Sequence, residues 1–233
     1  MKIKFHHTLI LSLMLLSTAC KLDNFSPPSV TLKGQLMYKG TPVNVEYNQV
    51  PFQIFQSGFK GNTPISGTFD QDGTYSVLTF NGNYKFTIPG GQGPFQWKEL
   101  PSGGRDSIAI NLSGDQTVNI EVTPYYMIRN AQLAASAGNV TAKFSIEKVI
   151  TDATAKNIQT VSLFVNKTQF TSAADHAAEA DLAGTAITDP TNVNLSVAIP
   201  KFTVTQNYVY ARVGIRIAGV EDMIFSPVQK ISY

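Results

Sequence analysis

The chain has 233 residues, a formal net charge of +2 and a single cysteine. Of its 18 basic residues, Lys2 and Lys4 lie in the N-terminal leader, so that 16 remain against 16 acidic residues. This balance argues against a broad electrostatic surface for nucleic acid, and a lone cysteine excludes an internal disulfide. About 210 residues remain after the leader, which suits one large or two small domains.

Residues 1–19 have the pattern of a secretory signal peptide. A basic start is followed by a short apolar run and then by the small residues Ser17, Thr18 and Ala19. The apolar run is too short to span a bilayer, which takes about 20 residues. The segment that ends in Cys20 resembles the bacterial lipobox, although Leu16 lies four residues before the cysteine rather than three. We therefore predict that Cys20 carries a lipid anchor, with a free thiol and an intermolecular disulfide as the alternatives.

Residues 20–29 form a short tether, and beyond it the chain is patterned as strands. Apolar and polar residues alternate over 30–38, 52–54, 84–88, 108–112 and 118–122. Asp72-Gly73 lies between two extended runs, which predicts a hairpin there.

A second set of alternating runs follows Thr123-Pro124. It comprises 140–147, 161–165, 193–199, 208–217 and a final strand near the C-terminus. The alanine-rich stretch 172–184 is too short and too weakly amphipathic for an independent helix, and we expect a long crossover loop with one helical turn. The fold class predicted is all-β, with two consecutive β-sandwich domains at 30–123 and 124–233.

Several short stretches carry a resemblance to a known family. "LDNF", "GTYSVLTFNGNYKF", "PGGQGPF", "VTPYY" and "FSPVQKI" resemble the Bacteroidetes surface lipoproteins of domain of unknown function 3823. The resemblance implies a transthyretin-like, carboxypeptidase-regulatory first half and a fibronectin- or immunoglobulin-like second half. It also implies a setting beside a starch-utilisation-type glycan uptake system, with a TonB-dependent porin and its glycan-binding lipoprotein as partners. The family brings no catalytic residues to transfer.

The residues themselves point to no catalytic or metal centre. His176 has Asp175, Glu179 and Asp181 nearby but lacks the further nitrogen or sulfur ligand that zinc needs, so a solvated polar loop explains it better. Asp70-Gln71-Asp72-Gly73 departs from a calcium loop in the place of its glycine, and turn chemistry explains it. We expect no cofactor and no metal.

Two groups of residues are candidates for binding. The first is the aromatic pair Phe95 and Trp97 with the amides Gln92 and Gln96, next to a glycine-rich turn, which could form a sugar platform. The alternative is that Trp97 packs at the junction of the two sandwiches or caps the first core. The second is an outward row on one strand, expected to contact a protein partner, to be covered by the other domain, or to make plain cross-strand pairs. It consists of Tyr208, Tyr210, Arg212 and Arg216.

These observations predict a non-enzymatic, lipid-anchored outer-membrane protein at the cell surface. Its expected role is glycan binding or presentation in a polysaccharide uptake system, with an oligosaccharide as ligand and no nucleic acid. The alternative is an adhesion or assembly module that contacts other outer-membrane proteins. A glycosidase would need two converging carboxylates about 5–9.5 Å apart.

Overall fold

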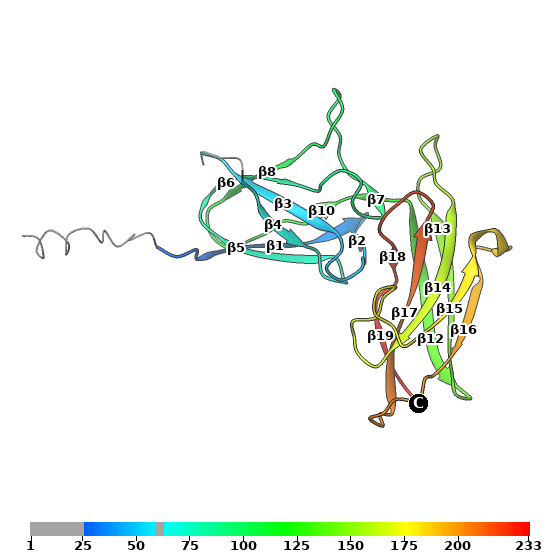
Figure 1. Cartoon of the computed structure of the whole chain (residues 1–233). Coiled ribbons are helices and arrows are strands. Elements are labelled where there is room, and N and C mark those ends of the chain that lie inside the picture. The colour runs from blue at the N-terminus through cyan, green and yellow to red at the C-terminus, as the bar shows by residue number, and fades with distance from the viewer. Residues whose placement is uncertain (1–25, 59–62) are drawn as a thin grey trace, which may run out of the picture.

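The computed structural model describes residues 26–58 and 63–233, which form two β-sandwiches. The strands of the first sandwich run crosswise to the long strands of the second, and the first sandwich packs against one end of the second (Figure 1). The predicted fold class, all-β with two consecutive sandwiches, is confirmed. The predicted signal peptide, the predicted lipidation site Cys20 and the first part of the predicted tether lie outside the described residues.

The first sandwich consists of a five-stranded and a four-stranded sheet. Their inward residues form an aromatic core in which the rings of Phe52, Phe69, Tyr75 and Phe86 lie within 5.1–6.3 Å of one another. The five-stranded sheet contains β1 (Val30–Tyr38), β2 (Thr41–Pro42), β5 (Thr74–Thr79), β9 (Gln116–Thr117) and β10 (Ile120–Glu121). The four-stranded sheet contains β3 (Pro51–Gln56), β4 (Ile65–Thr68), β6 (Gly82–Thr87) and β8 (Ile108–Leu112).

Asp72-Gly73 forms a turn as predicted, but the prediction of a hairpin there is wrong. Gly73 has a φ of 79°, and its N–H donates to the Asp70 carbonyl at 2.8 Å. The strands on either side belong to different sheets, since β4 pairs with β3 and β5 pairs with β1. The turn therefore carries the chain from one layer of the sandwich to the other, a long-range arrangement that local turn chemistry does not reveal.

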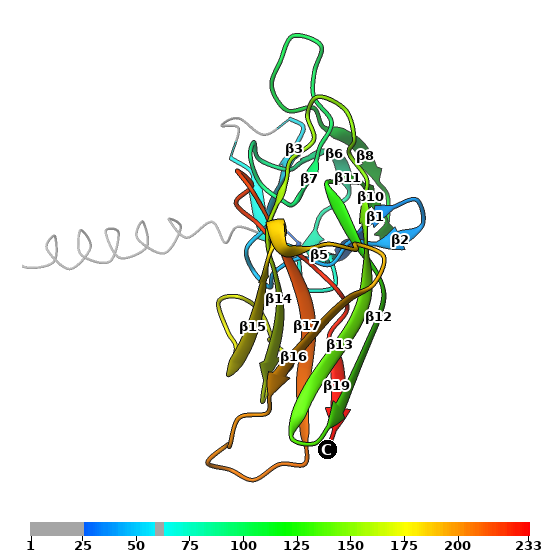
Figure 2. The ribbon, with the colours of Figure 1, turned by 90° about the vertical axis from the view of Figure 1, so that its right-hand side faces the viewer.

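The second sandwich packs a three-stranded against a five-stranded sheet, and its long strands lie side by side below the first sandwich (Figure 2). Strand β17 is central: every odd-numbered residue from Val209 to Ile217 is buried. The smaller sheet contains β12 (Tyr126–Ser136), β13 (Asn139–Lys148) and β16 (Val193–Ala198). The larger contains β14 (Ile158–Asn166), β15 (Ala178–Ala183), β17 (Tyr208–Ile217), β18 (Ile224–Phe225) and β19 (Gln229–Ser232).

The stretch 172–184 corrects the expectation of a crossover loop. Its second half is the edge strand β15, paired with β14, and the single helical turn η1 (Gly184–Ala186) follows it. Alternate residues of β15 are half-buried against the sandwich, which explains how a segment with little intrinsic strand preference becomes a strand. Within residues 26–58 and 63–233, no helix has the length and apolar character needed to cross a bilayer.

Candidate functional site

The two sandwiches are joined by directional polar contacts along a junction. The backbone N–H of Phe225 donates to the Asn44 carbonyl at 3.1 Å, and that of Gly93 donates to Oδ2 of the buried Asp222 at 2.6 Å. Two short strands, β7 (Phe95–Gln96) and β11 (Thr123–Pro124), pair where the chain passes from one sandwich to the other. Burial is the main factor that raises the pKa of Asp222, and the Gly93 N–H opposes it.

Phe95 and Trp97, predicted as an exposed sugar platform, are buried at this junction. Phe95 is 3% exposed and Trp97 is 5% exposed, so neither presents an open ring face to a ligand. The Trp97 indole N–H donates to the Asp106 carbonyl at 3.3 Å, which satisfies the polar edge of the ring inside the protein. The platform expectation is therefore corrected, and the placement matches the packing alternative.

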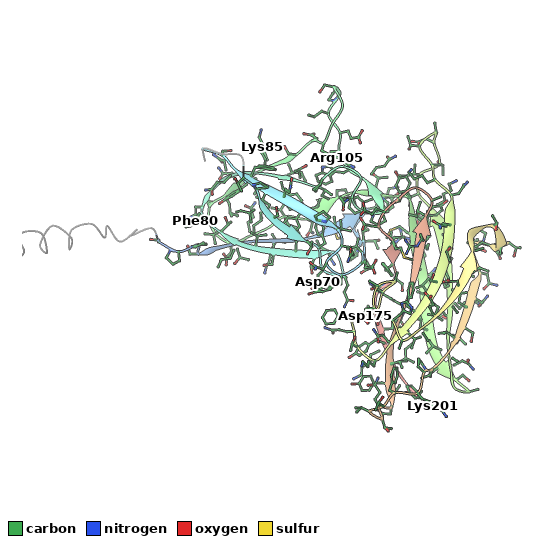
Figure 3. The ribbon with its side chains drawn as sticks, viewed as in Figure 1. Asp70, Phe80, Lys85, Arg105, Asp175 and Lys201 are labelled. Carbon is green, nitrogen blue, oxygen red and sulfur yellow. The ribbon has the colours of Figure 1, made fainter. Side chains whose placement is uncertain are left out.

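Gln92 and Gln96, expected to bind sugar hydroxyls, instead reach across the junction. The side-chain amide of Gln92 donates to Glu221 at 3.0 Å, and that of Gln96 donates to the Thr154 hydroxyl at 2.6 Å. Gln96, Phe95 and Trp97 are among the residues that line a groove of about 700 Å³ between the sandwiches. On its rim, Arg105 lies in a loop that projects from the first sandwich (Figure 3).

The predicted partner row on β17 is largely covered. Arg212 is 0% exposed, and its guanidinium donates to the Thr171 carbonyl and, at 3.1 Å, to the Val45 carbonyl of the first sandwich. Its guanidinium carbon lies 3.7 Å from the centroid of the Phe225 ring. Burial lowers the pKa of Arg212 to about 9, an effect that the Glu46 carboxylate partly offsets. Arg212 therefore joins the two sandwiches and is not available to a partner.

The other three members of the row are half-buried. Tyr208 and Tyr210 make an edge-on ring contact with centroids 5.8 Å apart, and the Lys230 ammonium lies 3.9 Å from the centre of the Tyr208 ring. Arg216 lies further along the same strand. The Lys230 contact is a cross-strand one between β19 and β17, whereas the two tyrosines are neighbours on the same face of β17.

The structure reveals a site that the sequence analysis missed, a groove of about 600 Å³ on the first sandwich. We call it the first groove. The surfaces that line it are rich in amides and hydroxyls and include one exposed aromatic ring and two opposite charges. Its main side chains are Lys33, Gln35, Tyr47, Asn48, Asp70 and Asn119.

Hydrogen bonds within the protein orient the amides of the first groove. The Asn48 side-chain carbonyl accepts from the Thr68 hydroxyl at 2.6 Å, and that of Asn119 accepts from the Gln35 backbone N–H at 3.2 Å. Because both oxygens are engaged, each amide nitrogen remains as a donor with no protein partner in the described part of the chain. The Gln35 side-chain nitrogen donates to the Asp72 carbonyl at 2.8 Å, which leaves its oxygen as an acceptor.

Tyr47 supplies the exposed ring of the first groove. It is 46% exposed, and its ring centroid lies 4.8 Å from that of Phe170, which belongs to the second sandwich and is 40% exposed. The signal in the sequence was an aromatic residue amid polar ones, Tyr47 in "VEYNQV" and Phe170 in "NKTQFTS". Such residues break the strand alternation, and side chains that break it are candidates for surface contacts.

Titratable groups elsewhere in the described part of the chain make local contacts. Among residues 26–58 and 63–233, no cluster of three or more His, Cys, Asp or Glu side chains has the geometry to hold a metal ion. The His176 Nδ1 lies 3.0 Å from the Ser172 carbonyl, and its ring packs against Phe164. Asp72 caps its own turn by accepting from the Thr74 N–H and hydroxyl at 3.0 and 2.6 Å.

Comparison with known families identifies the chain. A family model described as "Protein of unknown function (DUF3823) N-terminal domain" matches residues 30–123, and one described as "Domain of unknown function (DUF3823_C)" matches residues 126–230. A crystal structure of a DUF3823 family protein from Parabacteroides merdae is 34% identical, covers 89% of this chain and 100% of its own, and has a TM-score of 0.76. The chain belongs to the DUF3823 family.

Other solved structures extend this comparison. A DUF3823 family protein from Bacteroides ovatus is 31% identical with a TM-score of 0.77, and covers 88% of this chain and 99% of its own. A Bacteroides uniformis protein described as a "putative carbohydrate binding protein" is 16% identical with a TM-score of 0.67, and covers 89% of this chain and 100% of its own. At that identity it shows the shared fold. The search of curated proteins found no match to the chain.

Proposed function

We propose that this DUF3823 protein is a non-catalytic carbohydrate-binding protein, lipid-anchored through Cys20 at the outer-membrane surface, where it serves a polysaccharide uptake system. The main support for the proposal is the first groove. It combines an exposed aromatic ring with amides that have free hydrogen-bonding groups, and a ligand with many hydroxyls suits this combination. The Bacteroides uniformis relative described as carbohydrate binding lends support from the same fold.

Binding would rest on stacking and on paired hydrogen bonds. A pyranose ring laid on Tyr47 buries its C–H face against an aromatic surface that is already exposed. The amide nitrogens of Asn48 and Asn119 donate to sugar oxygens, while Gln35 and Asp70 accept from sugar hydroxyls. A groove that offers both donors and acceptors suits the hydroxyl group, which is both at once.

The composition of the first groove supports binding over hydrolysis. Asp70 is the one carboxylate among the described side chains that line it. Glycoside hydrolysis in its usual form needs two carboxyl groups flanking the bond to be cut. A single carboxylate accepts a hydrogen bond but supplies no acid and base pair.

The setting proposed for the protein follows from the lipobox-like segment and from the near-neutral chain. An acylated Cys20 would hold the sandwiches at the membrane, where weak individual contacts with a polysaccharide gain strength from multivalency. A TonB-dependent porin and its glycan-binding lipoprotein are the partners that this setting implies.

The test is a glycan array followed by calorimetry on the unlipidated chain, Lys21–Tyr233. The variant is Tyr47→Ala, and the matched control is Phe80→Ala, an aromatic of similar exposure at the far end of the first sandwich (Figure 3). We expect wild type and control to bind the same glycan and Tyr47→Ala to lose about tenfold in affinity, equal to about 1.4 kcal/mol.

A second variant separates stacking from hydrogen bonding. Asn48→Asp keeps the oxygen that accepts from Thr68 but removes the amide donor, so affinity for the same glycan should also fall. If the wild type binds no glycan, the proposal is overturned in favour of an assembly module that contacts protein. Equal losses in Tyr47→Ala and Phe80→Ala would remove the first groove as the site.

A further inference from the structure

A second, smaller groove lies directly beyond the first. It has a volume of about 340 Å³, is called here the second groove, and is lined from both sandwiches by Asn44, Gln71, Asp72, Gln169, Tyr210 and Lys230. The Gln71 side-chain oxygen is buried and has no hydrogen-bond partner in the described part of the chain. Such a group is costly to bury without a donor, and a ligand hydroxyl would supply one if the Gln71 side chain turned towards the second groove, which this residue lines.

One thin wall separates the two grooves. It consists of residues 44–47 and 70–72, held together by the Val45 N–H, which donates to the Gln71 carbonyl at 3.2 Å. Tyr47 and Asp70 face the first groove, while Asn44 and Gln71 face the second. The same two backbone segments therefore line both sites, and Asp70 lies at the edge of the first sandwich that faces the second (Figure 3).

The second sandwich continues this surface. Gln169 lines the second groove, and the next residue, Phe170, packs on Tyr47, so the two exposed rings together form a step between the grooves. Each ring comes from a different sandwich. The path from one groove to the other therefore crosses the junction on aromatic surface.

Arg212 lies beneath this step and holds its two sides together. Its guanidinium donates to the Val45 carbonyl, two residues from Tyr47, and to the Thr171 carbonyl, next to Phe170. No carboxylate forms an ion pair with it among the described residues. A buried cation of this kind is expensive, and the bonds it makes fix the two segments that carry the rings.

Resting on the proposed function, we infer that the ligand is a linear, neutral oligosaccharide that runs from the first groove over Tyr47 and Phe170 into the second. Neutrality follows from the charges, since each groove contains one lysine and one aspartate: Lys33 and Asp70 in the first, Lys230 and Asp72 in the second. The site is therefore built by both sandwiches, and a disaccharide occupies only part of it.

The experiment measures the affinity of the unlipidated protein, Lys21–Tyr233, for oligosaccharides of increasing length. The probes are maltooligosaccharides, xylooligosaccharides and cellooligosaccharides from the disaccharide to the hexasaccharide, titrated by calorimetry into wild type, Phe170→Ala and Gln169→Ala. Wild-type affinity should rise at least tenfold from disaccharide to hexasaccharide. Gln169→Ala should lose most of that gain while binding the disaccharide within about twofold of wild type. Phe170→Ala, which also removes a contact to Tyr47, should weaken the hexasaccharide more than the disaccharide.

The outcomes separate this inference from the proposed function. Equal affinity for short and long chains, or variants that weaken all lengths alike, would overturn the extended site and leave glycan binding in place. Absence of binding to every probe and to the array would overturn both. Because Phe170 is an exposed residue whose backbone carbonyl makes the contact to Asn166, the alanine variant should fold as wild type does.

Discussion

The stability of the first groove depends on the absence of a side chain at Gly34. A Cβ built there would lie 1.9 Å from the Val118 carbonyl oxygen, 2.6 Å from its carbon and 2.8 Å from the Tyr75 ring. Two of these atoms are backbone, so no rotamer change relieves the clash. Gly34→Ala must therefore push residues 116–119 away from β1.

The cost can be worked from the bonds that this movement breaks. The Val118 N–H donates to the Lys33 carbonyl at 2.8 Å, the Tyr75 hydroxyl to the Val118 carbonyl at 2.7 Å, and the Gln35 N–H to Asn119 at 3.2 Å. At about 1 kcal/mol for each, the loss is about 3 kcal/mol. For a domain the size of the first sandwich, this loss of stability corresponds to a fall in Tm of roughly 12–24 °C.

Thermal unfolding followed by circular dichroism is the assay, with Ser76→Ala as the control. Ser76 is exposed on β5 opposite Lys33, and its substitution should change stability by about 0.5 kcal/mol or less. Glycan affinity should fall in Gly34→Ala as well, because Asn119 moves with the displaced segment. A Gly34→Ala protein that melts within 3 °C of wild type would refute the described attachment of residues 116–119 to β1.

Three further predictions concern the junction. Trp97→Ala should lose about 3–5 kcal/mol of stability as a core truncation, seen as a lower urea midpoint; a stable variant that lost only glycan binding would instead restore Trp97 as a ligand platform. Because burial raises the pKa of Asp222, its contribution to stability increases as pH falls through that raised pKa and is lost as pH rises. Asp222→Asn keeps an acceptor for the Gly93 N–H and carries no buried charge, so it should be more stable than wild type at neutral pH. In urea titrations this difference in the free energy of unfolding should shrink towards pH 4. A difference that stays constant with pH would contradict the raised pKa of Asp222. Arg212→Lys cannot bridge two carbonyls as a guanidinium does, and calorimetry should show a loss for long oligosaccharides that exceeds the loss for the disaccharide.

Alternation of apolar and polar residues was sufficient to predict most of the strands. It works for β13, where one face is buried and the other is mostly open, and for β17, although the second face of β17 is itself covered around the buried Arg212. It fails where the pattern is interrupted. β12 was missed because its ladder with β13 shifts register between Arg129 and Gln132, and Asn130 has a φ of 52°. β15 escapes prediction because two of its three inward residues, Ala178 and Ala180, are small, so that the apolar side of its alternation with Glu179 and Asp181 is weak.

The candidate site could not be predicted in the same way. Phe95 and Trp97 were correctly singled out as unusual, but their burial depends on strands β7 and β11 meeting at the junction, a contact between segments about 28 residues apart. Tyr47 and Phe170 are more than 120 residues apart, and only the packing of the two sandwiches brings their rings to 4.8 Å. Sequence periodicity reports which face of a strand is buried, and it carries no information on how one sandwich meets another.

The chemistry of the junction indicates why its buried charges persist. A purely apolar junction could have equal or greater stability, because removing an arginine or a carboxylate from water costs more than most of their bonds return. Apolar packing has little direction, however, and would allow the sandwiches to slide. Arg212 and Asp222 each bond a backbone group of the first sandwich, the Val45 carbonyl and the Gly93 N–H, and these contacts set one register. A site built from rings on two separate sandwiches requires that register, since a shift of a few ångströms would part Tyr47 from Phe170 and break the path between the grooves.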